Sequence, residues 1–506
     1  MNSIRIENLR SLQDTGPISL SPLTILLGNN SSGKSTFLRT FPLLKQSFQE
    51  KILGPISFFG SLVDFGNFDT AITRNNNNNT ISISLEFDIS ERDFLILYSK
   101  NAKYKNKKPV KIKFDFKKYE TSDVLYISKC IIKIVGENLI LSFSDSNTLK
   151  QLLLNEKDYT YLFPNTKISY KYGHFFPLFQ IEKNNIYSKH NIFMKPLIEL
   201  LNGKSRKGKE DERVIFYYLR NFELFPICGK DFSLELLSNS FFYDEDTRDI
   251  CKKLNNKEIG IDIFSEYLFL SQIPRLLQTI ENYLFKEFKN LFYSKPLRAN
   301  AERYYRIQPL AVDEVSADGR NIISFINNLN DLQKVNFVKW INSNFDFEIK
   351  IETYVGHQSL LIKNNCDEDF SNISDMGFGY SQIIPIITQL WSLTEKISHN
   401  DDMENSYIFA IEQPELHLHP KMQRELIKAF CSVIKLAREH KIDVKIILET
   451  HSEKMINYLG EMVEEKTIAN KDISILLFEK VNKVTDIRTV LFNDKGYLVD
   501  WPINFF

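Results

Sequence analysis

The octapeptide Gly28–Ser35, GNNSSGKS, constrains the fold of this chain more than any other feature. It has the GxxxxGK[ST] spacing, it follows the apolar run Leu23–Leu27, and Phe37, Leu38 and Phe41 recur after it at helical spacing. A buried strand, a glycine-containing loop and a helix form the context in which this spacing makes a phosphate-binding P-loop. The alternative, a glycine-rich turn with a chance lysine, would not require a strand before the loop and a helix after it. We therefore expect an α/β fold around a nucleotide site.

The residue types of the loop suit a triphosphate. Backbone N–H groups of Asn30–Ser35 would lie at a helix N-terminus, which carries about half a positive charge. Lys34 would contact the β- and γ-phosphates, and the Ser35 hydroxyl would bind Mg²⁺. ATP and Mg²⁺ are thus the expected cofactors. The predicted ATP-binding residues are Gly28, Asn29, Asn30, Ser31, Ser32, Gly33, Lys34, Ser35 and Thr36.

A second motif, Tyr407–Pro420, reads YIFAIEQPELHLHP. Its apolar strand ends in Glu412, and an acid there can hold the magnesium shell. Ser35 and Glu412 are therefore the predicted metal ligands, while a plain strand end before a proline turn is the alternative. His417 and His419 alternate as zinc ligands can, but no cysteine lies nearby, so a loop is the preferred interpretation.

Two further segments complete the pattern. Ser374–Gln382, SDMGFGYSQ, places glycines, serines and a glutamine at a predicted helix start, which suits a γ-phosphate bound from a second subunit. His451 follows the predicted strand Val444–Leu448 and can reach the γ-phosphate. Taken alone, the first segment also fits a simple turn and helix, and His451 also fits a structural histidine. The predicted signature residues are Ser374, Gly377, Gly379, Ser381 and Gln382.

Composition sets outer limits. The 506 residues leave room for roughly three domains of ~150 residues. Lys plus Arg and Asp plus Glu both number 64, so any contact with DNA or RNA would need a local basic patch. The five cysteines are scattered without a CxxC pair, no signal segment follows Met1, and no run of ~18 apolar residues occurs. A cytoplasmic protein with no membrane contact is expected.

Hydrophobic patterns divide the chain. Alternation in Ile81–Phe87 and Val110–Phe116 predicts an antiparallel meander over residues ~80–185, with Asn75–Asn79 as a hairpin tip. Gly203–Arg213 is polar and predicts a linker, and the strand–helix–strand pattern of Tyr407–Leu448 predicts a parallel sheet. One helical face is expected to carry Ile273, Leu276, Leu277, Ile280, Leu284 and Phe288. The expected domains are residues 1–115 (an N-terminal ATPase lobe), 116–290 (an inserted meander and helical arm) and 291–506 (a C-terminal ATPase lobe).

The order of these motifs resembles the SMC/RecF-like branch of the ATP-binding-cassette ATPases. It is most similar to stand-alone bacterial AAA-type ATPases of that branch, relatives of the overcoming-lysogenization-defect (OLD) ATPases, many of which serve antiphage systems such as Septu and PARIS. The resemblance covers roughly residues 1–90 and 291–506. It implies an ATPase head with a mixed sheet and helices, an antiparallel β subdomain and an α-rich insertion.

By this resemblance, Glu412 matches the Walker B acid, Leu416–His419 the D-loop and His451 the H-switch. The signature serine would be Ser374 or Ser381, supplied by the other subunit, so that ATP is buried between two subunits of a homodimer or higher oligomer. The roles given to these residues are those that the resemblance to the family implies.

Two departures from the family pattern matter. Gln413 stands where the catalytic glutamate is usual, and a glutamine cannot accept a proton at neutral pH. It can still orient water, so hydrolysis is expected to be slow, or Glu415 substitutes; the predicted catalytic set is Glu412, Gln413, Glu415 and His451. OLD proteins also carry a TOPRIM nuclease after the ATPase, which has an acidic Glu…DxD set. No set of that kind is visible in the residues after His451 here.

Three functions follow as hypotheses. The preferred one is a sensor or scaffold ATPase of an antiphage complex that controls a separately encoded nuclease. The second is a DNA-repair-type ATPase that contacts DNA through the basic runs Lys103–Lys108 and Lys204–Lys209, although such runs also fit solvated loops. The third, suggested by Gln413, is an ATP-gated clamp with little turnover. The trigger and the identity of the partner stay open.

Overall fold

The computed structural model describes most of the chain. The described residues are 1–73, 79–90, 107–180, 192–202, 227, 254–257, 260–307, 311–365, 367–399, 405–481 and 484–501. The predicted linker Gly203–Arg213 and the basic run Lys204–Lys209 lie outside them, as do most of Asn75–Asn79 and of Lys103–Lys108.

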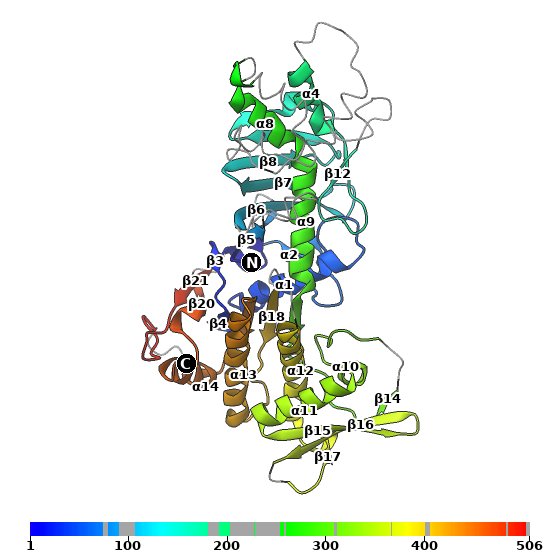
Figure 1. Cartoon of the computed structure of the whole chain (residues 1–506), viewed down its shortest axis with the longest axis vertical. Coiled ribbons are helices and arrows are strands. Elements are labelled where there is room, and N and C mark those ends of the chain that lie inside the picture. Colours follow the sequence, from blue (N-terminus) through cyan, green and yellow to red (C-terminus); the bar gives the residue numbers. More distant parts are fainter. Residues whose placement is uncertain are drawn as a thin grey trace.

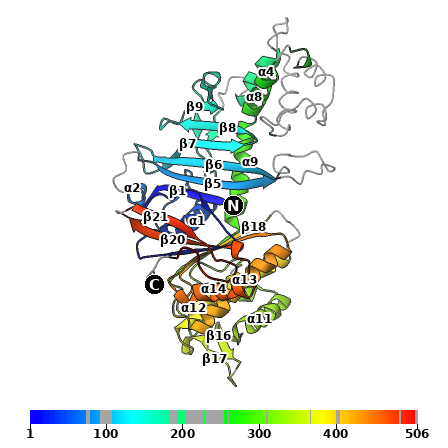
Figure 2. The same cartoon turned by 90° about the vertical axis from the view of Figure 1, so that its left-hand side faces the viewer.

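An antiparallel sheet forms one half of the molecule. Its described strands are β1 (Ser3–Leu9), β2 (Leu12–Asp14), β3 (Ile18–Ser19), β5 (Ile81–Ser90), β6 (Lys107–Lys118), β7 (Leu125–Ile134), β8 (Glu137–Phe143), β9 (Leu149–Leu154) and β10 (Lys157–Asp158). They run in the order β10-β9-β8-β7-β6-β5-β1-β2, with β3 beside β1. Figure 2 shows β5 to β9 side by side in this order. The predicted meander is confirmed for β5 to β10, between Ile81 and Asp158, and within the described residues it does not extend to the expected end near residue 185.

A mixed sheet forms the second half. Its described strands are β4 (Leu23–Gly28), β13 (Leu291–Ser294), β18 (Ser406–Glu412), β19 (Asp443–Glu449), β20 (Ile473–Val481) and β21 (Val484–Val490). Their order is β13-β18-β19-β4-β20-β21, and all neighbours are parallel except β20 and β21. The α/β fold with a mixed sheet is therefore as predicted.

Smaller strands and the helices complete the fold. The other strands are β11 (Ile168–Ser169), β12 (Leu178–Phe179), β14 (Tyr305–Arg306), β15 (Phe347–Tyr354), β16 (His357–Asn364) and β17 (Ser371–Asn372). The α-helices are α1 (Lys34–Gln49), α2 (Phe68–Ala71), α4 (Lys195–Asn202), α8 (Ile261–Ser271), α9 (Ile273–Lys289), α10 (Ile322–Asn328), α11 (Asp331–Phe345), α12 (Phe378–Ser398), α13 (Pro420–Glu439) and α14 (Glu453–Glu464).

Each face of the mixed sheet contributes to a different core. In β18, Ile408 and Ala410 join the core shared with α1, α9 and the antiparallel sheet, whereas Tyr407, Phe409 and Ile411 join the core with α12 and α13. This alternation follows from the two-residue period of a strand. Helix α9 runs along the antiparallel sheet towards the mixed sheet (Figure 1), and its predicted apolar face is buried. One of these two cores is thus shared by both sheets, and the other belongs to the mixed sheet with α12 and α13.

The expected boundary between residues 115 and 116 falls inside β6. This strand pairs with β5 on one side and β7 on the other along its length, and the register shift at Asp115/Phe116 does not interrupt it. The N-terminal strands and the meander therefore form one sheet, and the structure does not separate them there. The other expected boundary, at residue 291, coincides with the step from α9 to β13.

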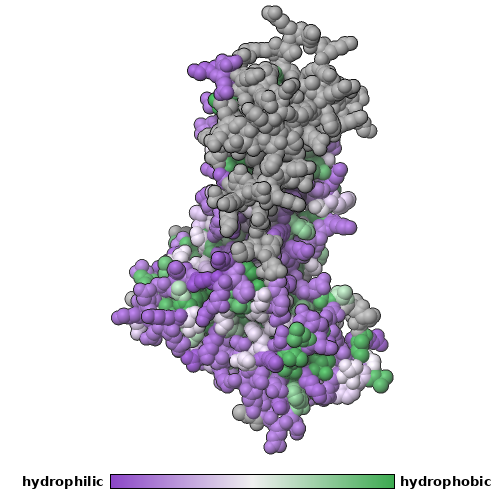
Figure 3. Space-filling view, viewed as in Figure 1, coloured by the Kyte–Doolittle hydropathy of each residue, from purple (hydrophilic) through white to green (hydrophobic). Residues whose placement is uncertain are grey.

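On the face shown in Figure 3, hydrophilic residues cover most of the coloured surface, with smaller apolar patches between them. Leu332 and Val335 of α11 are among the exposed apolar side chains. Within the described residues, no helix combines the length and apolarity that crossing a bilayer requires.

Candidate nucleotide site

The loop between β4 and α1 depends on two glycines. Gly28 has φ +146°, and a Cβ there would lie 2.2 Å from the carbonyl oxygen of Phe478. Gly33 caps α1 with φ +106°, and a Cβ there would lie 2.8 Å from Leu12 Cδ2. Any larger residue would collide with the neighbouring β20 or with the β1–β2 turn, so the loop keeps its path only with glycine at both positions.

Lys34 is folded back onto this loop. Its side chain is 3% exposed, and Nζ donates to the carbonyl oxygens of Gly28 at 2.9 Å and Asn29 at 2.8 Å. Burial lowers the pKa of Lys34, and the nearby Glu449 partly opposes that effect. The first loop residues after Gly28 are exposed while Ser32 is buried, and Ser32 Oγ has no hydrogen-bond partner among the described residues. The loop thus presents an open rim over a buried lysine.

Two carboxylates end the strands beside the loop. Glu449 ends β19, which pairs with β4, and Glu412 ends β18, directly opposite Glu449 in the register. Both are 2% exposed. Ser35 Oγ donates to Glu449 Oε1 at 2.8 Å. Burial raises the pKa of Glu449 to about 7, with the hydrogen bond from Ser35 opposing the shift and the charge of Glu412 adding to it.

Glu412 is held by a basic and an aromatic residue. Arg39, one turn after Ser35 on α1, donates from Nε at 2.8 Å and Nη2 at 2.7 Å, forming a bidentate pair, and Tyr293 of β13 donates its hydroxyl to the same carboxylate. The hydrogen bond to Glu412 raises the pKa of Arg39, and burial first of all raises that of Tyr293. In this structure the carboxylate expected to serve a metal is therefore neutralised by Arg39.

A buried arginine connects the strand end to α12. Arg298 is 4% exposed and donates from Nη2 to the carbonyl oxygen of Glu412 at 3.0 Å. Its backbone N–H donates to Gln382 Oε1 at 3.3 Å, and the Gln382 amide donates back to the Arg298 carbonyl at 3.4 Å. Burial lowers the pKa of Arg298 to about 10. Gln382 thus contacts the β18 end through Arg298, within one chain.

The other predicted catalytic residues follow the two strand ends. Gln413 has φ +43° and donates its N–H to the Glu449 carbonyl at 2.8 Å. Glu415 Oε1 accepts the N–H of His451 at 2.8 Å, and burial raises the pKa of Glu415. His451 follows Thr450 after the end of β19, and partial desolvation of its ring, together with the charge of Lys34, lowers its pKa. Glu412, Gln413, Glu415 and His451 are thus gathered at the same edge of the sheet as Lys34.

The signature segment is divided between the surface and the interior. Helix α12 begins at Phe378 after Gly377, and both Ser374 and Gly377 are exposed. Gly379 faces the chain after β18, because a Cβ there would lie 2.9 Å from the His417 carbonyl oxygen. Ser374 and Gly377 therefore lie where another subunit can reach them.

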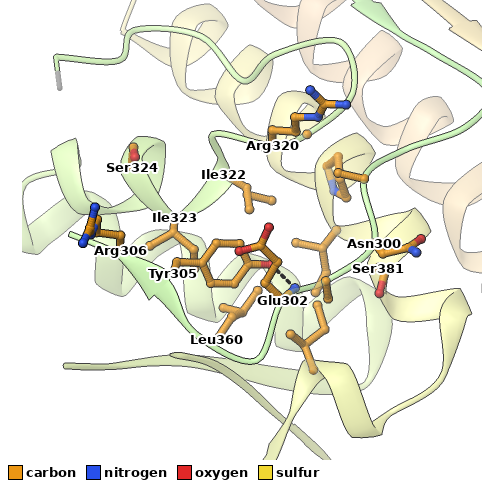
Figure 4. Close-up of a pocket in the computed structure, with 16 residues that line it drawn as sticks. Asn300, Glu302, Tyr305, Arg306, Arg320, Ile322, Ile323, Ser324, Leu360 and Ser381 are labelled. Atoms are coloured by element: carbon orange, nitrogen blue, oxygen red, sulfur yellow. Dashed lines mark hydrogen bonds between the residues drawn. The ribbon is translucent and has the colours of Figure 1, made fainter. Parts of the chain in front are cut away.

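Ser381 lies instead on the inner side of this helix. It is 9% exposed and helps to line a cavity of about 270 Å³ between α10, α12 and β16. Figure 4 shows Tyr305 and Glu302 in this cavity, with Arg320 and Arg306 at its margins. Of the two candidate signature serines, Ser374 has the accessible position and Ser381 the enclosed one.

The predicted histidine pair has local roles. The His417 ring lies 5.5 Å from that of Phe378, and His419 caps α13 by accepting the N–H of Lys421 at 3.3 Å. No group of three His, Cys, Asp or Glu side chains that could hold a metal ion occurs among the described residues. Magnesium bound with a nucleotide needs only one or two protein ligands beside phosphates and water. The Ser35 hydroxyl and the buried carboxylates of Glu412 and Glu449 fit that hard-oxygen chemistry.

Sequence reasoning missed four residues of this site: Arg39, Tyr293, Arg298 and Glu449. Glu449 carries the same signal that identified Glu412, an acid at the end of a buried strand. Arg39 lies four residues after Ser35, so it shares a helix face with it. Tyr293 and Arg298 carry no comparable local signal.

The comparison with protein families decides what kind of protein has this site. A sequence profile described as "AAA ATPase domain" matches residues 1–456. This chain belongs to the AAA ATPase domain family. The match extends from β1 into α14 and so includes both the loop and the two carboxylates.

Individual relatives are more distant. Endonuclease GajA of Bacillus cereus (strain HuB5-5) is 25% identical over 252 residues, which cover 44% of this chain and 37% of that protein. The chain thus matches little more than a third of the length of this relative. The family match confirms the predicted resemblance to AAA-type ATPases.

Two solved structures also align along most of the chain. An SMC head bound to the C-terminal winged-helix domain of ScpA covers 97% of each chain with a TM-score of 0.36 and 9% identity. The SMC head domain from Thermotoga maritima covers 96% of this chain and 97% of its own, with a TM-score of 0.35 and 11% identity.

Proposed function

We propose that this chain binds ATP with Mg²⁺ at Gly28–Ser35 and hydrolyses it. One observation carries the proposal: Lys34, Ser35, Glu412 and Glu449 meet at the carboxyl edge of neighbouring parallel strands, where α/β proteins bind ligands. The loop amides and Lys34 would hold the phosphates, and Ser35 with a carboxylate from the neighbouring strand ends would hold the metal. Bound Mg²⁺ would neutralise charge on the β- and γ-phosphates. Gln413 would orient water, and slow turnover is expected.

The proposed assembly is a dimer around ATP. The exposed Ser374 and Gly377 of one subunit would reach the nucleotide of the other, which explains why they lie at the surface rather than beside Lys34. ATP would then favour the dimer by mass action. In the cell, this unit would act as sensor or scaffold of an antiphage complex with a separately encoded nuclease; the relative named an endonuclease supports the association with nuclease activity.

The test combines turnover and assembly in the full chain. Purified protein is assayed for phosphate release and, by light scattering, for mass with and without ATP. Wild type should release phosphate slowly and double its mass with ATP, while Lys34→Ala should do neither. A Ser374→Ala variant should bind ATP as wild type does but fail to dimerise. Lys34-independent phosphate release would refute the ATPase assignment. An ATP-dependent dimer without measurable turnover would favour a clamp instead.

The effector is tested separately. The tagged chain is expressed with its operon neighbours and purified, and nuclease activity is measured in the eluate with and without ATP. Co-purification of a nuclease whose activity depends on ATP supports the proposed role. Recovery of the chain alone, with no nuclease activity, contradicts it.

A further inference from the structure

The two buried carboxylates at the loop are in different situations. Both oxygens of Glu412 are used, by the bidentate Arg39 and by Tyr293. Glu449 accepts one hydrogen bond, from the Ser35 hydroxyl, and its second oxygen is buried without a hydrogen-bond partner among the described residues. A buried carboxylate oxygen left in this way calls for an explanation, because unsatisfied buried polar atoms are uncommon.

Strand order places Glu449 nearer to the loop. β19 lies between β4 and β18, so Glu449 ends the strand that pairs with the loop strand, and Glu412 ends the strand beyond it. Neighbouring strands are about 4.8 Å apart. Glu412 is thus roughly two such spacings from β4, and it is Glu449 that contacts Ser35.

We propose that Glu449 is the carboxylate that holds the magnesium shell at Ser35, while Arg39 and Tyr293 keep Glu412 in a supporting role. This inference rests on the proposed function, in which MgATP binds at Gly28–Ser35. A hydroxyl that binds a cation must direct its O–H elsewhere, and Ser35 donates its O–H in a hydrogen bond to Glu449 Oε1. The second oxygen of Glu449 is free for the cation or for one of its waters.

The proposal is tested by nucleotide binding instead of turnover. The affinity of the full chain for a fluorescent ATP analogue is measured with Mg²⁺ and with EDTA, and the ratio of the two is the gain from the metal. Glu449→Gln should lower this gain about tenfold or more, a usual effect of removing a residue that orders a metal shell. Its affinity in EDTA should stay within about twofold of wild type. With Mn²⁺ in place of Mg²⁺, electron paramagnetic resonance should show correspondingly weaker binding of the ion in the presence of ATP.

Two further variants separate a metal role from a structural one. Glu137→Gln is the matched control: Glu137 is 5% exposed on β8 of the antiparallel sheet and pairs with Asn155, so its loss should leave the gain unchanged. Glu449→Asp keeps the charge on a shorter side chain and should retain part of the gain. Thermal melting checks that each variant is folded.

The outcomes distinguish this inference from the proposed function. A full metal gain in folded Glu449→Gln, with the gain lost in Glu412→Gln, overturns the role of Glu449 and leaves the ATP site in place. Should Glu449→Gln not fold, a full metal gain in folded Glu449→Ala, which lacks the carboxylate, overturns it instead. If wild type binds no ATP with or without Mg²⁺, the proposed function fails and this inference fails with it.

Discussion

Strand β6 of the antiparallel sheet and the strand ends of the mixed sheet place their charged residues differently. In β6 of the antiparallel sheet, Phe114 and its apolar neighbours face the core, while Lys111 and Lys113 lie on the other face. There Lys111 pairs with Glu86 of β5 and Lys113 with Glu7 of β1. In the mixed sheet, Glu412 and Glu449 are buried at the strand ends. Burying charge costs stability unless it is compensated. The comparison indicates that core packing determines where charged residues lie in the antiparallel sheet. At the loop edge of the mixed sheet, their positions follow from the proposed nucleotide chemistry.

The largest effect is expected at the loop of the mixed sheet. Lys34→Ala should reduce ATP turnover at least about 100-fold, because it removes a positive group aimed at the phosphates. Its melting temperature should not fall, since the variant loses a buried cation whose hydrogen bonds within the described part of the chain go to two loop carbonyls. Phosphate release and thermal melting are measured together. ATP turnover that persists in Lys34→Ala would contradict the catalytic role assigned to the loop edge of the mixed sheet.

The antiparallel sheet should give the reverse result. Phe114 is 1% exposed and its ring contacts those of Phe116, Phe175 and Phe176. Phe114→Ala should lower the free energy of unfolding by about 3–5 kcal/mol, measured by urea denaturation. The ATP affinity of the folded protein should be unchanged. A loss of affinity at constant folded fraction would show that this sheet also shapes the nucleotide site.

A smaller effect is expected at the charge pair of the mixed sheet. Arg39→Ala should cost about 2 kcal/mol of folding stability, because it leaves the Glu412 carboxylate buried with Tyr293 as its remaining side-chain donor. Adding Glu412→Gln should recover most of that loss, since it removes the uncompensated charge. The double variant compared with each single variant measures the coupling. Additive losses would mean that Arg39 and Glu412 do not act as a pair.

The smallest effect is expected on the open face of the antiparallel sheet. Lys111 pairs with Glu86 at 2.9 Å, with side chains 61% and 32% exposed. Lys111→Ala should cost less than about 1 kcal/mol, the usual value for a solvent-exposed pair. A loss as large as that of Arg39→Ala in the same denaturation assay would contradict the contrast between the two sheets.

The sequence predicts individual strands of both sheets, but it does not predict how far the antiparallel sheet extends. Alternation in Val110–Phe116 correctly predicts a strand with one buried face, because a two-residue period is a local property. The apolar runs Leu23–Leu27, Tyr407–Ile411 and Val444–Leu448 correctly predict buried strands, and the helix between the last two correctly predicts that those two are parallel. The extent of the antiparallel sheet was not predictable in the same way, because the pairing of β1 with β5 joins residues about 80 positions apart.

The site was predictable only where a motif carries it. Gly28–Ser35 and Glu412 follow from local patterns, whereas the contact of Ser35 with Glu449 joins residues 414 positions apart, and that of Arg39 with Glu412 joins residues 373 apart. Strand order decides which of the two acids lies beside the loop, and no periodicity encodes strand order. The exposure of a single serine also depends on contacts between distant segments, so only the structure distinguishes the exposed Ser374 from the enclosed Ser381.

The most direct test of the central claim is an experimental structure of the full chain with a non-hydrolysable ATP analogue and Mg²⁺. The account predicts the triphosphate on the backbone amides of Asn30–Ser35, with Lys34 turned from the loop carbonyls towards the phosphates. It predicts the metal beside Ser35 and within reach of Glu449. A triphosphate bound elsewhere, for example in the cavity lined by Arg320 and Ser381, with Lys34 still hydrogen-bonded to Gly28, would contradict it.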